Sequence, residues 1–251
     1  MAGATATGTP DGESTRTRRR GFRFLDAVVL LIVIAAIAVG AHLLGFGPFA
    51  DSGTDANRAD VTDVELTEDD TALAESEPLE MSIPVLGLRA DIDPEPCPLT
   101  NGALDPAGLS TACYYVADDR PYTLPGSDTD DLSVLAGHAA AGRPAVFDDL
   151  YNTADDTFTL VEGDELLVRT EASGDNWLVY RATDFHAIGK PSLGDDPDVW
   201  GEEAMPGRML TISCIQPRNP FADATDNVIV GWSFAGLADA DAAAELLDAA
   251  S

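Results

Sequence analysis

The sequence predicts a mainly β fold, a small closed β-barrel with short helices, preceded by one N-terminal transmembrane helix. Three observations support this. Short apolar runs alternate with turn-rich segments, helical patterns are scarce, and one long apolar run carries no charge. Barrel closure removes unpaired strand edges. The predicted strands are residues 83–88, 132–136, 165–169, 177–185, 208–213 and 227–234, with one or two helical turns at 145–151.

Residues 27–47 read AVVLLIVIAAIAVGAHLLGFG and contain no Lys, Arg, Asp or Glu. About 20 helical residues cross the hydrocarbon core of a bilayer. Basic residues that flank a spanning helix stay in the cytoplasm. We therefore expect a cytoplasmic basic tail (1–25), a single-pass anchor in the cell membrane (26–47) and an extracellular remainder. The alternative is a cleaved signal peptide, but this run is longer than usual and lacks a cleavage site of A-x-A type.

The rest of the chain divides by composition. Residues 51–80 hold eleven acids, one base and no aromatic residue. Such a segment cannot bury enough apolar surface to fold, so we predict a disordered stalk over 48–81. Residues 82–236 are long enough for one core and are the predicted catalytic domain. The Ala- and Asp-rich segment 237–251 is predicted to be a C-terminal tail, either a short helix or frayed.

The charge balance excludes one class of partner. The chain has 14 Lys+Arg against 44 Asp+Glu, a net charge of -30, and Lys190 is its only lysine. Proteins bind nucleic acid through Lys and Arg contacts to phosphates, so no nucleic-acid partner is expected. The acids show no spaced calcium-loop motif, so we predict neither a metal site nor a cofactor.

The three cysteines divide into a pair and a single thiol. Outside the membrane disulfides persist, and an odd count leaves one thiol to explain. Cys97 and Cys113 flank the turn-rich segment CPLTNGALDPAGLSTAC, so we predict that they pair. Closing a loop of this size contributes about 3 kcal/mol in the chain-entropy model. Cys214 is then free, at the end of the apolar strand MLTISC.

A cysteine nucleophile needs an activating base, because the thiolate is the attacking form. His138 ends the apolar strand LSVLAGH among glycines and alanines that leave its ring unobstructed. His186 has bulky neighbours and is interpreted as a packing or surface residue. Cys214 and His138, each ending a strand, indicate thiol acyl transfer. The alternative is an inert, buried Cys214.

The order of these features resembles a sortase, a membrane-anchored cysteine transpeptidase of Gram-positive bacteria. An apolar anchor and a stalk are followed by LSVLAGH with His138, a hairpin, TISC with Cys214 and a last apolar strand. Over residues 82–234 the chain is most similar to the actinobacterial class E/F types. The resemblance implies a sortase-like barrel and cleavage of an LPxTG-like sorting signal between Thr and Gly.

The resemblance also implies roles and partners. Cys214 would attack the threonine carbonyl to form a thioacyl-enzyme, and His138 would act as general acid and then general base. The implied substrates are surface proteins with a C-terminal sorting signal. The implied acceptor is an amine of a cell-wall precursor or of a pilin lysine.

Sortases also have an arginine about a dozen residues after the cysteine, which binds the developing oxyanion. The matching segment here, ATDNV, has no arginine. Three interpretations remain. Arg218 reaches in from the loop after Cys214; Thr225, Asn227 or a backbone N–H donates instead; or the protein is a weak or inactive homologue.

Two other functions remain open. An L,D-transpeptidase of peptidoglycan also uses an extracellular cysteine, often with a nearby arginine as in CIQPR, but its usual Ser-x-Gly-Cys context is absent. The third interpretation is a non-catalytic, membrane-anchored binding or assembly module with a buried Cys214.

Overall fold

The computed structural model describes residues 63–67, 72–117, 122–219 and 221–249. The predicted basic tail and transmembrane anchor, residues 1–47, lie outside the described residues, as does most of the predicted stalk. Within the described ranges, no helix is both long and apolar enough to cross a bilayer.

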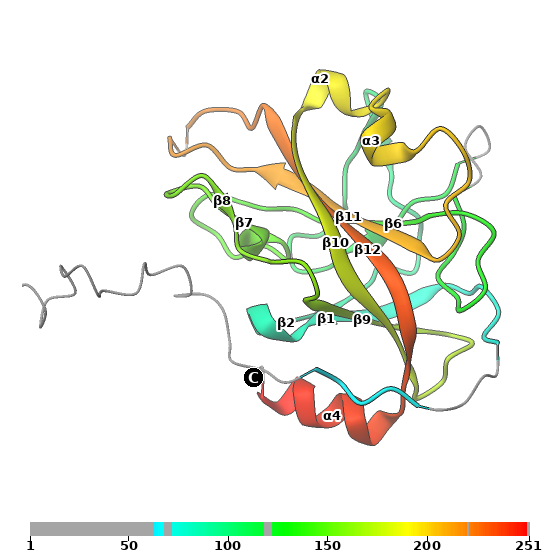
Figure 1. Ribbon diagram of the computed structural model, residues 1–251. Helices are drawn as coiled ribbons and strands as arrows, with labels where there is room; N and C mark the ends of the chain where they lie inside the picture. The colour runs from blue at the N-terminus through cyan, green and yellow to red at the C-terminus, as the bar shows by residue number, and fades with distance from the viewer. Residues whose placement is uncertain (1–62, 68–71, 118–121, 220, 250–251) are drawn as a thin grey trace, which may run out of the picture. The chain divides into compact units, whose positions relative to one another are not determined.

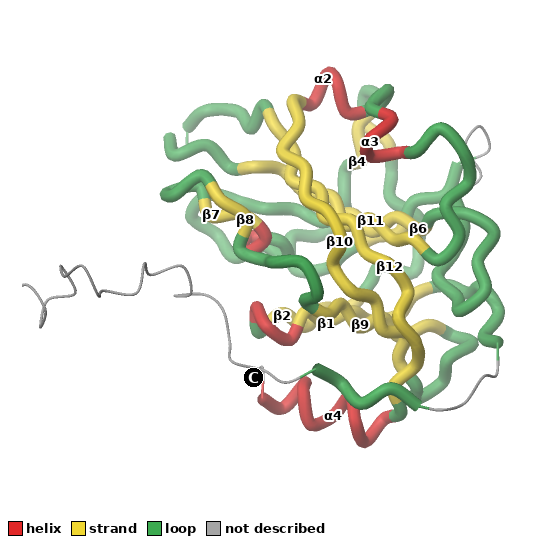
Figure 2. The backbone as a smooth tube through the Cα atoms, viewed as in Figure 1, coloured by secondary structure: helices red, strands yellow, loops and turns green. Residues whose placement is uncertain are grey.

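The core of the fold is a curled sheet of eight strands in the order β2-β1-β9-β10-β12-β11-β6-β5 (Figures 1 and 2). All neighbours are antiparallel except β6 and β11, which run parallel. The strands are β1 (Pro78–Ile83), β2 (Leu88–Asp91), β5 (Cys113–Tyr114), β6 (Ser133–Ala136), β9 (Glu165–Thr170), β10 (Trp177–Gly189), β11 (Arg208–Ile215) and β12 (Asp226–Ala238).

Short elements connect these strands. Two small hairpins lie outside the main sheet, one of β3 (Leu99–Thr100) with β4 (Ala103–Leu104), the other of β7 (Tyr151–Asn152) with β8 (Thr157–Phe158). The helical elements are the 3-10 turns η1 (Pro84–Leu86) and η2 (Asp148–Leu150) and the helices α2 (Lys190–Leu193), α3 (Pro197–Trp200) and α4 (Ala240–Ala249). The mainly β prediction with short helices is therefore confirmed.

The two edges of the sheet meet at one point. Ile92, just after β2, forms a parallel bridge with Ala112, just before β5. The Asp93 N–H donates to the Ala112 carbonyl at 2.8 Å, and the Ala112 N–H donates to the Asp91 carbonyl at 3.1 Å. The curl is completed by this bridge rather than by a continuous ladder, so the sheet is less fully closed than the predicted barrel.

Apolar side chains alternate between the two faces of the sheet. The largest cluster lies on one face and includes Leu135, Met209 and Trp232. On the other face, Val134 and Ile212 belong to a separate cluster that Tyr122 and α3 help to cover. Because side chains of a strand alternate in direction, residues of even number on β6 and β11 face this second cluster. Cys214 and His138 have even numbers as well.

The predicted strands after residue 130 are confirmed, and the prediction of a single strand over residues 83–88 is wrong. Residues 83–88 do not form one strand: Pro84 begins a 3-10 turn between β1 and β2, because proline fits a helical first turn and cannot donate to a ladder. Within the predicted helical segment 145–151, Asp148–Leu150 form one 3-10 turn, and Tyr151 begins β7.

The disordered-stalk prediction is wrong for the described part of 48–81. Val64 is buried, and its N–H donates to Glu165 at 2.8 Å. β1 begins at Pro78, within the predicted stalk. Val64 packs in a cluster with Leu246 of α4, which is the helical form of the predicted tail. The prediction relied on the acidic composition and gave no weight to two alternating apolar residues, Val64 and Leu66, which pack in this cluster.

An ion cluster ties β10 to β11 across β12. The Asp184 carboxylate accepts hydrogen bonds from both amino groups of Arg208, at 2.8 and 2.7 Å, and from His186 Nε2 at 2.7 Å. A Cβ at Gly231 would lie 2.5 Å from the carboxylate oxygens, so glycine leaves room for the crossing. Burial raises the pKa of Asp184, but hydrogen bonds from Arg208, Thr183 and His186 outweigh it and hold that pKa well below its ordinary value.

Asp184→Asn is expected to lower the free energy of unfolding by about 2 kcal/mol at pH 7. The folded-state pKa of Asp184 lies below its unfolded value of about 3.9, so the stabilisation is full above about pH 5 and declines as the pH falls through 3.9 and below. Urea denaturation at several pH values should show the difference from wild type shrinking toward pH 3. Asp175→Asn, at an exposed turn, is the control. A difference that does not change with pH would contradict the assignment.

Candidate active site

The ends of two neighbouring strands bring Cys214 and His138 into one cleft. β6 and β11 pair with Ala136 opposite Ile212. The Gly137 N–H donates to the Ile212 carbonyl at 3.1 Å, so the ladder extends past that pair. His138 and Cys214 follow Ala136 and Ile212 by the same offset, which places them side by side on one face of the sheet. Both line a pocket of about 450 Å³, a volume typical of ligand sites.

The position of His138 is fixed by both its backbone and its ring. Its carbonyl accepts a hydrogen bond from the Phe147 N–H at 2.9 Å. Its ring Nε2 lies 2.8 Å from the Pro106 carbonyl oxygen. A carbonyl can only accept, so Nε2 carries a proton and donates. The ring is therefore held at a defined angle at the rim of the sheet.

Gly137 allows this arrangement, because an added Cβ would lie 2.5 Å from Val146 Cγ1 and 2.7 Å from Phe147 Cδ2. Gly137→Ala is expected to lower the free energy of unfolding by about 1–3 kcal/mol through overpacking and to displace His138. Thermal denaturation measures the first effect. Val146→Ala in the Gly137→Ala background should recover part of the lost stability. An unchanged melting temperature in Gly137→Ala would show that the contact is relieved elsewhere.

Cys214 lies half-buried at the end of β11, and it is the free cysteine of the part of the chain that the structure describes. The Gln216 side chain donates to the Ala139 carbonyl, which ties the segment after Cys214 to the segment after His138. On its other side, Cys214 is directly opposite Asn227 of β12. Side chains of such a pair share a face with Cβ atoms about 5 Å apart. Asn227 also lines the pocket.

The structure separates the three candidate oxyanion donors. Arg218 is exposed, and its guanidinium donates to the carbonyls of Thr153 and Ala154 in the turn between β7 and β8. Thr225 is exposed and donates to Asp226. Neither belongs to the lining of the pocket, whereas Asn227 does. The prediction that Arg218 reaches into the cleft is therefore not met in this structure, because its side chain is bound elsewhere.

Sequence reasoning missed Lys190 and the aromatic wall of the pocket. Lys190 begins α2 and lines the pocket with Cys214. Its backbone N–H donates to the Thr225 carbonyl at 2.9 Å, which fixes the start of α2 against the segment before β12. One signal was available, since it is the only lysine of the chain. Tyr122 and Trp200 stack with centroids 5.2 Å apart beside the pocket, far apart in sequence and close only in the fold.

The predicted disulfide between Cys97 and Cys113 is present, and both cysteines are buried. The loop that it closes contains the hairpin of β3 and β4. Asn101 and Gly102 at its tip have positive φ, as a tight two-residue turn requires. Residues of this loop form one wall of the pocket, including Leu104 and Pro106. Among the described residues, no group of His, Cys, Asp or Glu side chains could hold a metal ion.

No protein-family model matches the sequence, and no curated protein matches it. Solved structures that resemble it include sortase C-1 of Actinomyces oris, with 19% identity over 62% of this chain and 72% of that chain, at a TM-score of 0.42. Sortase A of Listeria monocytogenes has 12% identity over 69% and 98% of the two chains, at a TM-score of 0.44. Sortase E1 of Streptomyces coelicolor, crystallised with a tripeptide in its active site, has 20% identity over 66% and 92%, at a TM-score of 0.41.

Proposed function

We propose that this protein is an extracytoplasmic cysteine transpeptidase of the sortase type, with Cys214 as nucleophile and His138 as general acid and base. The observation that supports this most strongly is the convergence of both side chains on one pocket. The strand-end motifs LSVLAGH and TISC add the resemblance noted above. A thiol and an imidazole at adjacent strand ends form the pair that acyl transfer through a thioester needs.

The proposed reaction has two steps. The Cys214 thiolate attacks a substrate carbonyl, a C–S bond forms, and the peptide C–N bond breaks as His138 protonates the leaving amine. An acceptor amine then gives a proton to His138 and attacks the thioester, a new C–N bond forms, and the Cys214 thiolate is released. No water is consumed, and His138 and Cys214 return to their starting state.

Asn227 and Lys190 are the groups that we assign to the developing oxyanion. Asn227 is the register partner of Cys214 on β12 and lines the same pocket, and amides can line an oxyanion hole. Lys190 is the cation among the described side chains of the lining, apart from the titratable His138. Together they would replace the arginine that sortases have near this position.

Lys190→Met is expected to slow the alkylation of Cys214 by the anion iodoacetate about fivefold, while neutral iodoacetamide should react with little change. A nearby cation raises the local concentration of an anion, and salt screens that attraction. The ratio of the two rates, measured at low and high ionic strength, checks this. Lys190→Arg is the charge-preserving control. Equal slowing of both reagents would point to altered packing instead.

The walls of the pocket suit an extended peptide. Tyr122, Trp200 and Leu193 supply an apolar surface beside Cys214. We infer that the substrate is a surface protein with a C-terminal LPxTG-like sorting signal, whose leucine would pack on this wall. The acceptor would be an amine of a cell-wall precursor or of a pilin lysine. The uncharged run 27–47 would anchor the enzyme in the cell membrane with its catalytic domain outside.

The test is to incubate the full-length protein with an LPxTG-type peptide, with and without a glycine-based amine. Intact mass spectrometry should show a thioacyl adduct on Cys214 that disappears when the amine is added, together with the ligated product. Cys214→Ala should form neither. Cleavage of a D-amino-acid peptidoglycan stem peptide, with no reaction of the LPxTG peptide, would favour an L,D-transpeptidase. An unreactive thiol towards all acyl donors would favour a binding module.

A further inference from the structure

The disulfide lies against the strand that carries His138. Cys113 on β5 is directly opposite Ala136 on β6, and Ala136 precedes His138 by two positions. Cys97, Cys113 and Ala136 form one buried cluster, with Leu104 packed against it. The disulfide therefore connects the loop of residues 97–113 to the base of the catalytic histidine.

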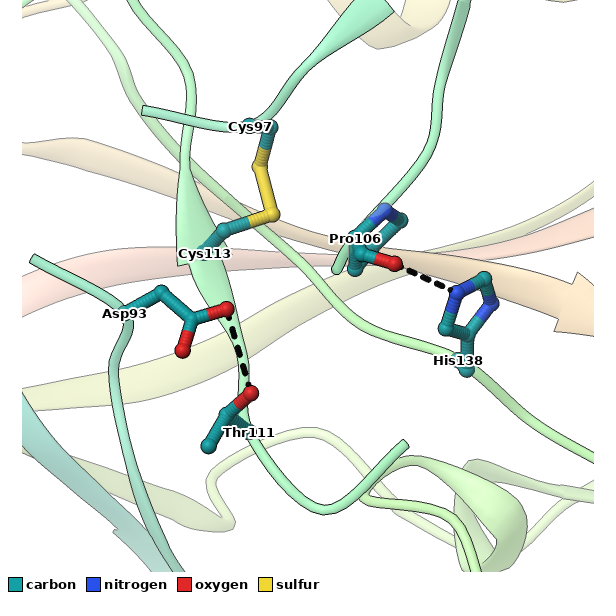
Figure 3. Close-up of a disulfide and its surroundings, with 6 residues drawn as sticks. All are labelled: Asp93, Cys97, Pro106, Thr111, Cys113 and His138. Atoms are coloured by element: carbon teal, nitrogen blue, oxygen red, sulfur yellow. Dashed lines mark hydrogen bonds between the residues drawn. A yellow bond between two sulfur atoms is a disulfide. The ribbon is translucent and has the colours of Figure 1, made fainter. Parts of the chain in front are cut away.

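The stem of this loop is fixed at several points besides the disulfide. The Thr111 hydroxyl donates to Asp93 Oδ2 at 3.1 Å, as Figure 3 shows. The Cys97 N–H donates to the Tyr114 carbonyl at 2.7 Å. These bonds sit beside the bridge between Ile92 and Ala112 that joins the sheet edges. The loop consequently leaves the sheet from a rigid base.

The far side of the loop reaches the catalytic histidine. The Pro106 carbonyl is turned toward the His138 ring and accepts from its Nε2 at 2.8 Å (Figure 3). Pro106 is buried, and its ring restricts the backbone φ angle. Three residues later, the Leu109 carbonyl accepts from the Val146 N–H at 2.7 Å. The loop thus contacts His138 and also the segment that packs behind Gly137.

We propose that Pro106 is a positioning residue whose carbonyl, held in place by the disulfide-closed loop, keeps the proton of His138 on Nε2 and leaves Nδ1 to exchange protons with the substrate. This rests on the proposed transpeptidase function. A third group that orients the base is a common part of such sites, usually a carboxylate or an amide. Here the main chain of a disulfide-bonded loop takes that part.

The assignment defines the path of the proton. In acylation, the Nδ1–H of the charged ring protonates the leaving amine as the C–N bond breaks. In transfer, the Nδ1 lone pair takes the proton of the acceptor amine as the new C–N bond forms and the C–S bond breaks. The proton on Nε2 stays there and remains hydrogen-bonded to the Pro106 carbonyl throughout both steps.

The experiment follows the His138 ring directly by two-bond ¹H–¹⁵N NMR on ¹⁵N-histidine-labelled full-length protein in micelles. The chain has 3 histidines, so His138→Ala and His186→Ala spectra assign the signals. In the wild type, at a pH high enough to leave the His138 ring neutral, we expect the remaining proton on Nε2 and slow exchange of that proton with water. In Cys97→Ala/Cys113→Ala we expect the Nε2 proton to exchange with water about tenfold faster and part of the neutral ring to carry its proton on Nδ1, because the acceptor is no longer held.

The matched control is Thr100→Val, which removes the 2.9 Å bond from Thr100 to Asp105 in the same loop and keeps the disulfide. Its His138 tautomer and its Nε2–H exchange rate should equal those of the wild type. If the neutral ring of the wild type carries its proton on Nδ1, the proposal is overturned. This result does not depend on whether the cysteine variant folds. A folded cysteine variant with an unchanged tautomer and an unchanged Nε2–H exchange rate would overturn the part assigned to the disulfide.

The transpeptidation assay with an LPxTG-type peptide and an amine separates this proposal from the proposed function. Suppose that the wild type catalyses no transpeptidation, but the Nε2–H signal is present and depends on the disulfide. This result would reject the transpeptidase function and support the positioning of His138. Transpeptidation at the wild-type rate in a folded Cys97→Ala/Cys113→Ala variant would reject the positioning role alone. We expect that variant to lose about tenfold in kcat.

Discussion

His138→Ala is expected to reduce the turnover of an LPxTG-type peptide about a thousandfold, with the thioacyl adduct forming correspondingly slowly. General acid and base catalysis contributes about 10²–10⁴ in rate, and His138 is the imidazole that lines the pocket with Cys214. In the proposed mechanism the same ring protonates the leaving amine and deprotonates the acceptor, so both half-reactions should slow. Single-turnover kinetics with an internally quenched fluorescent peptide, with and without an added amine, would measure the two steps separately.

His186→Ala is the matched control for this variant. His186 donates to Asp184 in the ion cluster of β10 and β11, outside the pocket. Its replacement should lower stability somewhat and leave turnover within about twofold below the melting temperature. If His138→Ala kept wild-type turnover, the imidazole would not take part in the chemistry, and the convergence of the two strand ends would need another explanation.

Asn227→Ala is expected to lower kcat about a hundredfold, with a much smaller change in KM. Removal of one oxyanion donor typically costs about 10²–10³ in kcat, and a donor that acts on the developing charge affects the transition state more than the bound substrate. Asn227 is directly opposite Cys214 and lines its pocket, whereas Arg218 and Thr225 do not line it. Steady-state kinetics of peptide cleavage measures the effect.

Three further variants make this test specific. Arg218→Ala and Thr225→Val should retain turnover, because neither side chain lines the pocket. Asn227→Arg should retain or raise it, since sortases have an arginine about a dozen residues after the cysteine and Asn227 follows Cys214 by 13 positions. A hundredfold loss in Arg218→Ala, with none in Asn227→Ala, would return the role to Arg218.

Local chemistry made part of this predictable. The short apolar runs with turn residues between them indicated β6, β9, β10, β11 and β12, because side-chain alternation and glycine turns are properties of neighbouring residues. The disulfide was predictable for a related reason, since Cys97 and Cys113 are separated by only 16 positions and the loop between them is rich in turn formers. His138 and Cys214 were recognisable because each ends such a run.

The average composition of the predicted stalk led to a wrong prediction for the segment 63–67, in which two apolar residues pack on the folded domain. Residues 63–67 read DVELT within an acidic segment, and acidity predicted a disordered stalk. Val64 and Leu66 nevertheless pack beside α4 and Trp177, a surface that no local pattern reveals. Burial of a single large aliphatic side chain stabilises by about 1.5–3 kcal/mol, enough to order a short segment against a preformed face.

Residue type and position at a strand end are local properties, so the sequence indicated which residues could perform thiol acyl transfer. Which of these residues share one pocket depends on the tertiary structure. The pairing of β11 with β12 sets Asn227 opposite Cys214, the end of β10 brings Lys190 to the same pocket, and the disulfide-closed loop carries Pro106 to His138. Each of these contacts depends on strand register and loop closure over tens of residues, and the sheet as a whole fixes both.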